Sequence, residues 1–170
     1  MPTELMIHQA RLTSFLRQQF LLDWDGIHGA THWARVLRLG RHLAKENGAD
    51  IEVVTLFALL HDSCREDDNR DPEHGLRASR VVRAQNGILF VINDDQEDRL
   101  AAACEGHSKG GLSDDVTIQV CWDADRLELG RLAITPDPHR LGTDTAKRLC
   151  RHAWPYEHIG RSDGPSLLLG

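Results

Sequence analysis

Three patterns are absent from this chain of 170 residues, and each absence removes a class of protein. Its four cysteines form no CxxC pair and no dense disulfide pattern, so reduced thiols in a cytoplasmic protein are the simplest prediction. No window approaches the roughly 18 apolar residues of a membrane-spanning helix. The first residues lack a basic region followed by an apolar run, so we expect neither export nor membrane insertion.

Clustered basic charge is missing as well. The 26 acidic residues outnumber the 20 lysines and arginines, which gives a formal net charge of −6. Nucleic-acid and anionic membrane surfaces reward clustered Lys and Arg, so we expect neither as the main partner. The contents of 41% hydrophobic and 27% charged residues lie near globular averages, and the length suits one domain with a sizeable core.

The chain is rich in helical signals. Apolar residues recur at helical spacing over residues 5–22 and 28–47. Capping patterns predict the starts of four more helices, at Asp71-Pro72-Glu73, Asn93-Asp94-Asp95, Ser113-Asp114-Asp115 and Thr143. We expect a single domain over residues 1–160, followed by a loose tail over residues 161–170.

One segment, residues 51–64, is apolar on nearly every side and is too long for a typical buried strand. We therefore predict that it is a central, buried helix. It ends in His61-Asp62, and burying such polar groups unpaired would cost roughly 2 to 7 kcal/mol. The pair needs a partner, and a metal ion is the best candidate.

Residue types that bind metals stand on other predicted helices as well. His32 precedes the His61-Asp62 pair, and Asp123 follows it, each separated from the pair by whole helices. Two imidazoles and two carboxylates make a mixed set of nitrogen and oxygen ligands. Such a set suits Mn²⁺, Fe²⁺, Co²⁺, Ni²⁺ or Zn²⁺, with Mg²⁺ as a further candidate, and suits Ca²⁺ less.

The motifs GIHGATHWARV, TLFALLHDSCRED and QVCWDADRL resemble the H…HD…D signature of the HD-domain superfamily of metal-dependent phosphohydrolases. The resemblance covers roughly residues 26–127. It implies an all-α helical bundle with a metal site between central helices, formed by His32, His61, Asp62 and Asp123. It also implies that a metal-activated water hydrolyses a small phosphorylated substrate, a nucleotide or another small phosphate ester.

Two more histidines leave the number of metal ions, one or two, open. His74 and His107 resemble the extra histidines with which binuclear members of the superfamily hold a second metal, with Asp62 as the bridge. Ser108, however, stands where the cyclic-dinucleotide phosphodiesterase branch has a histidine. The alternative interpretations are an exposed first-turn residue for His74 and a cation at a helix end for His107.

Further residues are candidates for catalysis and for substrate binding. Asp62 serves as ligand and bridge, while Glu66 or His107 would handle protons. In the guanylate-tetraphosphate hydrolase branch the motif is HDxxED, whereas this chain has HDxxxED, so Glu66 is shifted by about 100° on a helix. We expect a solvated side chain at His28; the alternatives are a hydrogen-bond partner of a metal ligand and an outer ligand. The candidates for contacting a substrate phosphate are Arg65, Lys109 and Arg126.

Two functions other than hydrolysis are compatible with the same residues. The domain could sense a nucleotide without turning it over, because a fold does not fix a function. A di-iron oxygenase on the same scaffold would need His74 and His107 to bind a second, redox-active iron. The oligomeric state is open.

Overall fold

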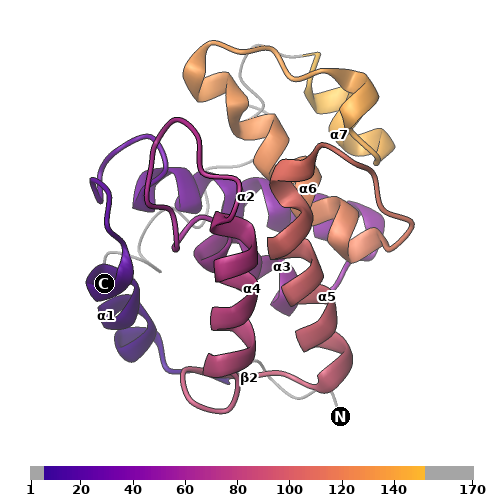
Figure 1. Ribbon diagram of the computed structural model, residues 1–170. Helices are drawn as coiled ribbons and strands as arrows, with labels where there is room; N and C mark the ends of the chain where they lie inside the picture. The colour runs from indigo at the N-terminus through magenta and orange to yellow at the C-terminus, as the bar shows by residue number, and fades with distance from the viewer. Residues whose placement is uncertain (1–5, 152–170) are drawn as a thin grey trace.

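The computed structural model describes residues 6–151, so the expected tail and the domain end at residue 160 lie outside the described residues. Within this range the chain folds into helices joined by short loops (Figure 1). The α-helices are α1 (Gln9–Gln19), α2 (Ala30–Asn47), α3 (Ile51–Leu60), α4 (His74–Gln85), α5 (Asp94–Gly106), α6 (Val116–Leu127) and α7 (Asp144–Leu149). Three short 3₁₀-helices are η1 (His107–Lys109), η2 (Glu128–Leu132) and η3 (Pro138–Arg140).

The all-α prediction is confirmed, with one small addition. Strands β1 (Met6–Ile7) and β2 (Phe90–Val91) pair antiparallel, with Met6 opposite Val91. This short pair ties the start of α1 to the loop between α4 and α5. None of the described helices is long and apolar enough to cross a membrane.

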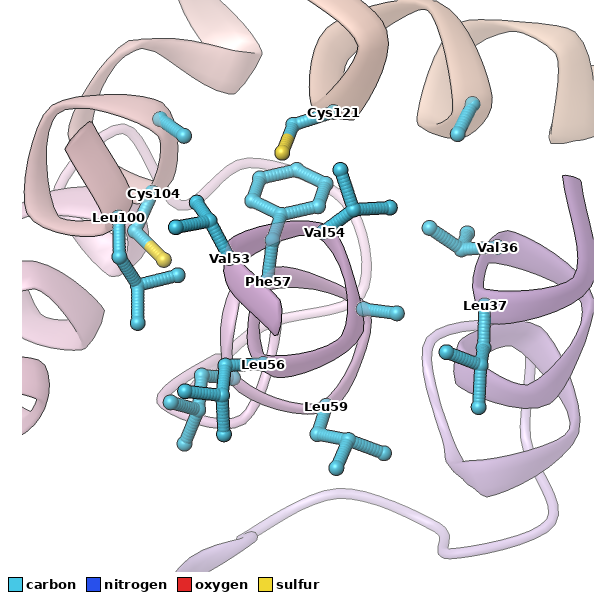
Figure 2. Close-up of a cluster of buried hydrophobic side chains, with 14 of the residues drawn as sticks. Val36, Leu37, Val53, Val54, Leu56, Phe57, Leu59, Leu100, Cys104 and Cys121 are labelled. Carbon is cyan, nitrogen blue, oxygen red and sulfur yellow. The ribbon is translucent and has the colours of Figure 1, made fainter. Parts of the chain in front are cut away.

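Helix α3 forms the centre of the bundle, as its sequence predicts. Every residue from Val53 to Leu60 is buried. Helices α2, α5 and α6 surround it, and Figure 2 shows Phe57 of α3 among side chains from these neighbours. Because α3 is apolar on all sides, it can be covered on all sides, and its C-terminal end delivers His61 and Asp62 into the interior.

The predicted helix starts were mostly correct. Asn93 and Gln96 form a reciprocal capping box, and Asp115 and Thr143 accept hydrogen bonds from the backbone of α6 and α7. The helix predicted up to about Gln85 is present as His74–Gln85, but the predicted N-cap at Asp71 is wrong, because the N-cap of α4 is Glu73. The carboxylate of Asp71 accepts instead from the guanidinium of Arg77, at 2.5 Å, and from the backbone of the preceding loop.

Helices α4 and α5 run side by side (Figure 1), and one glycine sets how closely they pack. A Cβ atom at Gly75 would lie 2.5 Å from the carbonyl oxygen of Cys104, so only glycine fits there without a shift of the backbone. Gly75 directly follows His74, and Cys104 lies three residues before His107. The close approach therefore brings these two histidines together.

Candidate metal centre

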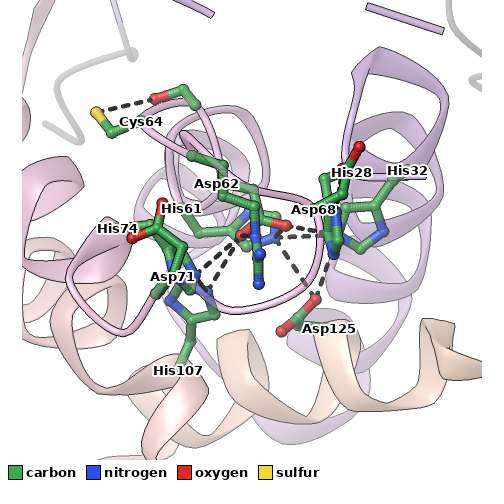
Figure 3. A network of polar contacts seen from close by, with 12 residues as sticks. His28, His32, His61, Asp62, Cys64, Asp68, Asp71, His74, His107 and Asp125 are labelled. Atoms are coloured by element: carbon green, nitrogen blue, oxygen red, sulfur yellow. Dashed lines mark hydrogen bonds and ion pairs between the residues drawn. The ribbon is translucent and has the colours of Figure 1, made fainter. Parts of the chain in front are cut away.

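Histidines and aspartates from different helices meet at one buried point (Figure 3), which we call the histidine–aspartate cluster. Its members come from α2, the C-terminal end of α3, α4, η1 and α6. They are His32, His61, Asp62, His74, His107 and Asp125. All are buried except Asp125, whose side chain is 20% exposed. The sequence expectation that His61 and Asp62 are buried together with distant histidines is thus met.

Asp62 lies in the middle of the cluster and faces both sides. Its Oδ2 atom is 3.4 Å from Nε2 of His32 and 3.6 Å from Nε2 of His61. Its Oδ1 atom is 3.1 Å from Nε2 of His74 and 3.4 Å from Nε2 of His107. One carboxylate is therefore shared between two pairs of imidazoles.

Backbone carbonyl oxygens fix the tautomer of three of the histidines. A carbonyl oxygen only accepts, so the Nδ1 atom that contacts it must carry the hydrogen. The pairs are His61 with Phe57 at 3.0 Å, His107 with Cys104 at 2.6 Å, and His74 with Asp71. In the neutral ring the Nε2 atom then carries a lone pair, and in all three it is this atom that points into the cluster.

The Nε2 atoms approach each other closely. Those of His74 and His107 are 2.8 Å apart, and those of His32 and His61 are 3.2 Å apart. Two lone pairs at this distance repel unless a proton or a metal cation lies between them. Neutral imidazoles held through Nδ1, together with carboxylates, are the donor set that divalent transition metals prefer. The residues present thus fit a metal ion.

The pKa values of the cluster also indicate that its carboxylates are stabilised by positive charge. Burial disfavours the charged form of His32, but hydrogen bonds with Asp125, Asp62 and Glu128 outweigh it and raise the pKa of His32 to about 10. Burial is likewise outweighed at Asp62 and Asp125, where the surrounding histidines hold the pKa of each carboxyl well below its usual range. Both acids remain carboxylates at neutral pH, and a divalent cation would balance them.

Glu128, which the sequence reasoning missed, supports the cluster from behind. It is fully buried at the start of η2, and its Oε2 atom lies 2.8 Å from Nδ1 of His32. Its Oε1 atom accepts a hydrogen bond from Nε of Arg35 at 2.5 Å. A carboxylate on the far side of a histidine fixes the ring and makes it a better metal ligand.

The structure is similar to the crystal structure of a predicted HD superfamily hydrolase from an uncultured Thermotogales bacterium. The TM-score is 0.69, and the match covers 89% of this chain and 88% of the other, at 20% sequence identity. The chain therefore has the same fold as that protein. No protein-family model and no curated protein sequence matches this chain. The likeness establishes the fold, and the cluster occupies the place between helices that the HD signature implies.

The last aspartate of the HD signature must be corrected. The structure places Asp123, the expected ligand, outside the cluster. Its two carboxylate oxygens accept four hydrogen bonds, from Gln119, the backbone of Gly142, and the backbone and hydroxyl of Thr143. Asp125 lies in the cluster instead, with Oδ1 3.4 Å from His32 and 3.5 Å from His61. Residues two apart on a helix point in nearly opposite directions, so only one of these two aspartates can face the histidine–aspartate cluster.

A cavity of about 240 Å³ opens over the cluster. Among its walls are Asp62, His107 and Asp125 of the cluster, together with Arg65, Arg126 and Arg140. His28 also faces this cavity and is 8% exposed, with Nδ1 2.8 Å from a carboxylate oxygen of Asp68. The expectation of a solvated His28 is therefore wrong. The cavity gives a small molecule access to the histidine–aspartate cluster.

The remaining candidates divide into two groups. Arg65 and Arg126 line the cavity, and Nε of Arg65 donates to Oδ1 of Asp62 at 3.1 Å. The side chain of Lys109 is 63% exposed and pairs with Glu105 at 3.1 Å. That of Glu66 is 59% exposed and lies 3.6 Å from Arg77. Within the described part of the chain, neither of the last two is among the residues that line the cavity.

Proposed function

We propose that this protein is a metal-dependent phosphohydrolase that acts on a small phosphate ester, nucleotides included. The observation that carries the proposal is the shared carboxylate of Asp62. It lies between two histidine pairs and lines a cavity that arginines also line. Convergent imidazoles and carboxylates suit a metal, and guanidinium groups suit phosphate oxygens. The likeness to a predicted HD superfamily hydrolase supports the same reaction class.

Two overlapping sets of residues would hold metal. One consists of His32, His61 and Asp62, with Asp125 beside them, and the other of Asp62, His74 and His107. A divalent ion bound there would lower the pKa of a water molecule and neutralise charge on a phosphoryl oxygen. Asp62 contributes one oxygen to each set, so it would bridge two ions if both bind.

The protein's own groups would orient the substrate. Arg65 and Arg126 present fixed positive charge to the cavity, where the anionic groups of the substrate would lie, and Arg65 is the one that contacts Asp62. Glu128 keeps Nε2 of His32 directed into the cluster. Of the two candidates for proton transfer, His107 lines the cavity, whereas Glu66 lies at the surface beside Arg77. We therefore assign proton handling to His107 when it is not occupied as a ligand.

Metal quantification combined with a phosphoester screen tests this proposal. We expect bound divalent metal and phosphate release in the wild type, and loss of both in His61→Ala. His8→Ala is the matched control, because His8 is exposed and is not part of the cluster. Thermal unfolding of each variant would show whether it is folded. Full metal content and activity in a folded His61→Ala variant would refute the assignment.

The His74–His107 group also favours a second candidate, a di-iron oxygenase, because it supplies the extra ligands that a second iron requires. Iron content near two per chain, without phosphate release from any ester, would favour the oxygenase. Bound metal and nucleotide without any turnover would instead favour the sensing module.

A further inference from the structure

The segment of residues 137–143 carries Arg140 to the cavity wall and is tied firmly to helix α6. At one end, Gly142 and Thr143 donate hydrogen bonds to the buried carboxylate of Asp123. In the middle, Nη1 of Arg126 donates to the carbonyl oxygen of Arg140 at 2.6 Å. The position of Arg140 is thus set by the same helix that supplies Asp125 to the cluster.

Arg126 has unused hydrogen-bonding capacity in this wall. The residue is 8% exposed, and its buried Nη2 atom has no hydrogen-bond partner among the described residues. A buried charged donor without a hydrogen-bond partner destabilises the protein. Arg126 also lines the cavity, so an anionic group bound there would lie beside this guanidinium.

Arg140 adds a second positive charge to the same wall. Nη1 of Arg140 would lie 3.8 Å from a Cβ atom at Gly110, another residue of the cavity wall. Two guanidinium groups beside one cavity suit an anion, and the carboxylates of the same wall, Asp62, Asp125 and Asp137, leave these two arginines without a side-chain ion pair among the residues that the structure describes.

Arg65, the third arginine of the cavity, differs because its charge is already matched. Its Nε atom contacts Asp62, the carboxylate that the two histidine pairs share. A phosphoryl group at the metal centre would lie beside Arg65. Arg126 and Arg140 therefore remain for a different group of the substrate.

We propose that Arg126 and Arg140 form a subsite for a second anionic group, so that the substrate is a compact molecule carrying two phosphates or a phosphate and a carboxylate. This proposal rests on the proposed phosphohydrolase function, whose substrate class it names. The composition of the cavity agrees with it. Among the described residues of the wall, Leu129 and Pro136 are apolar, and none is Phe, Tyr or Trp, so a nucleobase has no such ring to stack on.

Calorimetry with two non-hydrolysed probes tests the subsite on the metal-loaded protein. Inorganic phosphate carries one anionic group, and methylenediphosphonate carries two. We expect the wild type to bind methylenediphosphonate at least about tenfold more tightly, which corresponds to one additional charge-assisted contact. Metal analysis after each titration checks that the probe has not removed the metal.

The Arg140→Gln variant separates the two groups of the substrate. We expect it to weaken methylenediphosphonate binding about tenfold, while phosphate binding changes by no more than about twofold, because the two positions are independent. Arg140→Lys should retain part of the affinity, and Arg126→Gln should repeat the pattern. Arg140 and Arg80 are both exposed, so Arg80→Gln on α4 is the matched control and should bind as the wild type does.

Two results would overturn the subsite. Equal affinity of the wild type for both probes would show that no second anion is recognised. An equal loss for both probes in Arg140→Gln would assign the arginine to the metal-held phosphate. Neither measurement requires turnover, so a failed phosphoester screen would refute the hydrolase proposal and still leave the selectivity for two anionic groups measurable.

Discussion

Two aspartates two residues apart on helix α6 should respond to the same substitution in opposite ways. Asp123 is fully buried and holds the segment that carries Arg140. Asp125 is partly exposed and faces His32 and His61. We predict that Asp123→Asn lowers stability and leaves the metal ligands in place, whereas Asp125→Asn lowers metal affinity and leaves the fold stable.

The magnitude for Asp123 follows from its hydrogen bonds. All four of its bonds come from donors, at 2.7 to 2.9 Å. The oxygen of an asparagine at this position could still accept two of these hydrogen bonds. Its amide nitrogen cannot accept, so it would replace the carboxylate oxygen that accepts the other two. Losing two bonds to a charged group costs on the order of 3 to 6 kcal/mol. For a domain of this size that lowers the melting temperature by roughly 10 to 20 °C.

The magnitude for Asp125 is read from metal binding. Asparagine keeps the shape of the side chain and removes one negative charge from the ligand set. We expect the affinity for the divalent metal to fall at least about tenfold. The melting temperature of the metal-free protein should fall by less than in Asp123→Asn, because Asp125 pairs, of the described residues, only with His32 and His61 and lies at the edge of the cavity, where water can reach it.

Thermal unfolding of metal-free protein and competition with a chromophoric chelator measure the two quantities separately. Each variant is the control for the other, because both exchange the same atoms on the same helix. If Asp123→Asn lost metal affinity without a change in melting temperature, and Asp125→Asn retained it, the two assignments would be reversed and our account of α6 would be incorrect.

Two further predictions concern the supports of the site. In Glu128→Gln the amide oxygen can still accept a hydrogen bond from Nδ1 of His32, but the negative charge is lost. We therefore expect the metal affinity to fall about tenfold in the same chelator assay. Unchanged metal affinity would show that Glu128 has only a structural role. Asp115 caps α6. Burial raises the pKa of its carboxyl group, but hydrogen bonds from the backbone of Ile118, from Arg99 and from the backbone of Thr117 outweigh burial and lower that pKa. Its contribution is therefore present above its unfolded pKa of about 3.9 and is lost as the pH falls through the lower folded value. Asp115→Ala should lower the free energy of unfolding by about 1 kcal/mol at pH 7. In urea unfolding, the difference between variant and wild type should shrink below a pH of about 3.9. A difference that stays constant with pH would contradict the capping role of the carboxylate.

Much of the fold was predictable because its signals are local. Asn93, Asp115 and Thr143 each accept hydrogen bonds from the first turn of the following helix, a role that depends only on neighbouring residues. The apolar segment of α3 could only be central. Asp71 misled the prediction, because its carboxylate binds Arg77, one turn inside the next helix, instead of capping it.

The choice between Asp123 and Asp125 was not local, since it depends on how α6 is rotated in the bundle. A signal did exist in the spacing. Cys121 is buried against α3, and Asp125 and Glu128 follow it at four and seven residues, on the same face of the helix. Asp123 instead follows Gln119 by four residues, and these two contact each other. The positions of two carboxylates relative to the apolar stripe could thus have identified the pair that faces the cluster.

Asp123, Asp125 and Arg126 lie on one turn of α6 and have three different roles. Successive residues are about 100° apart, so these three side chains point in three directions. Asp123 holds the segment of residues 137–143, Asp125 faces the histidines, and Arg126 faces the cavity. Because the backbone of one helical turn is rigid, α6 fixes the positions of Asp125 and Arg126 relative to each other, and Asp123 and Arg126 hold the backbone of the segment that carries Arg140. A substrate whose two anionic groups match the distance between the metal ligands and the arginine pair would be selected by its length, and a series of bisphosphonates with longer spacers would measure that length directly.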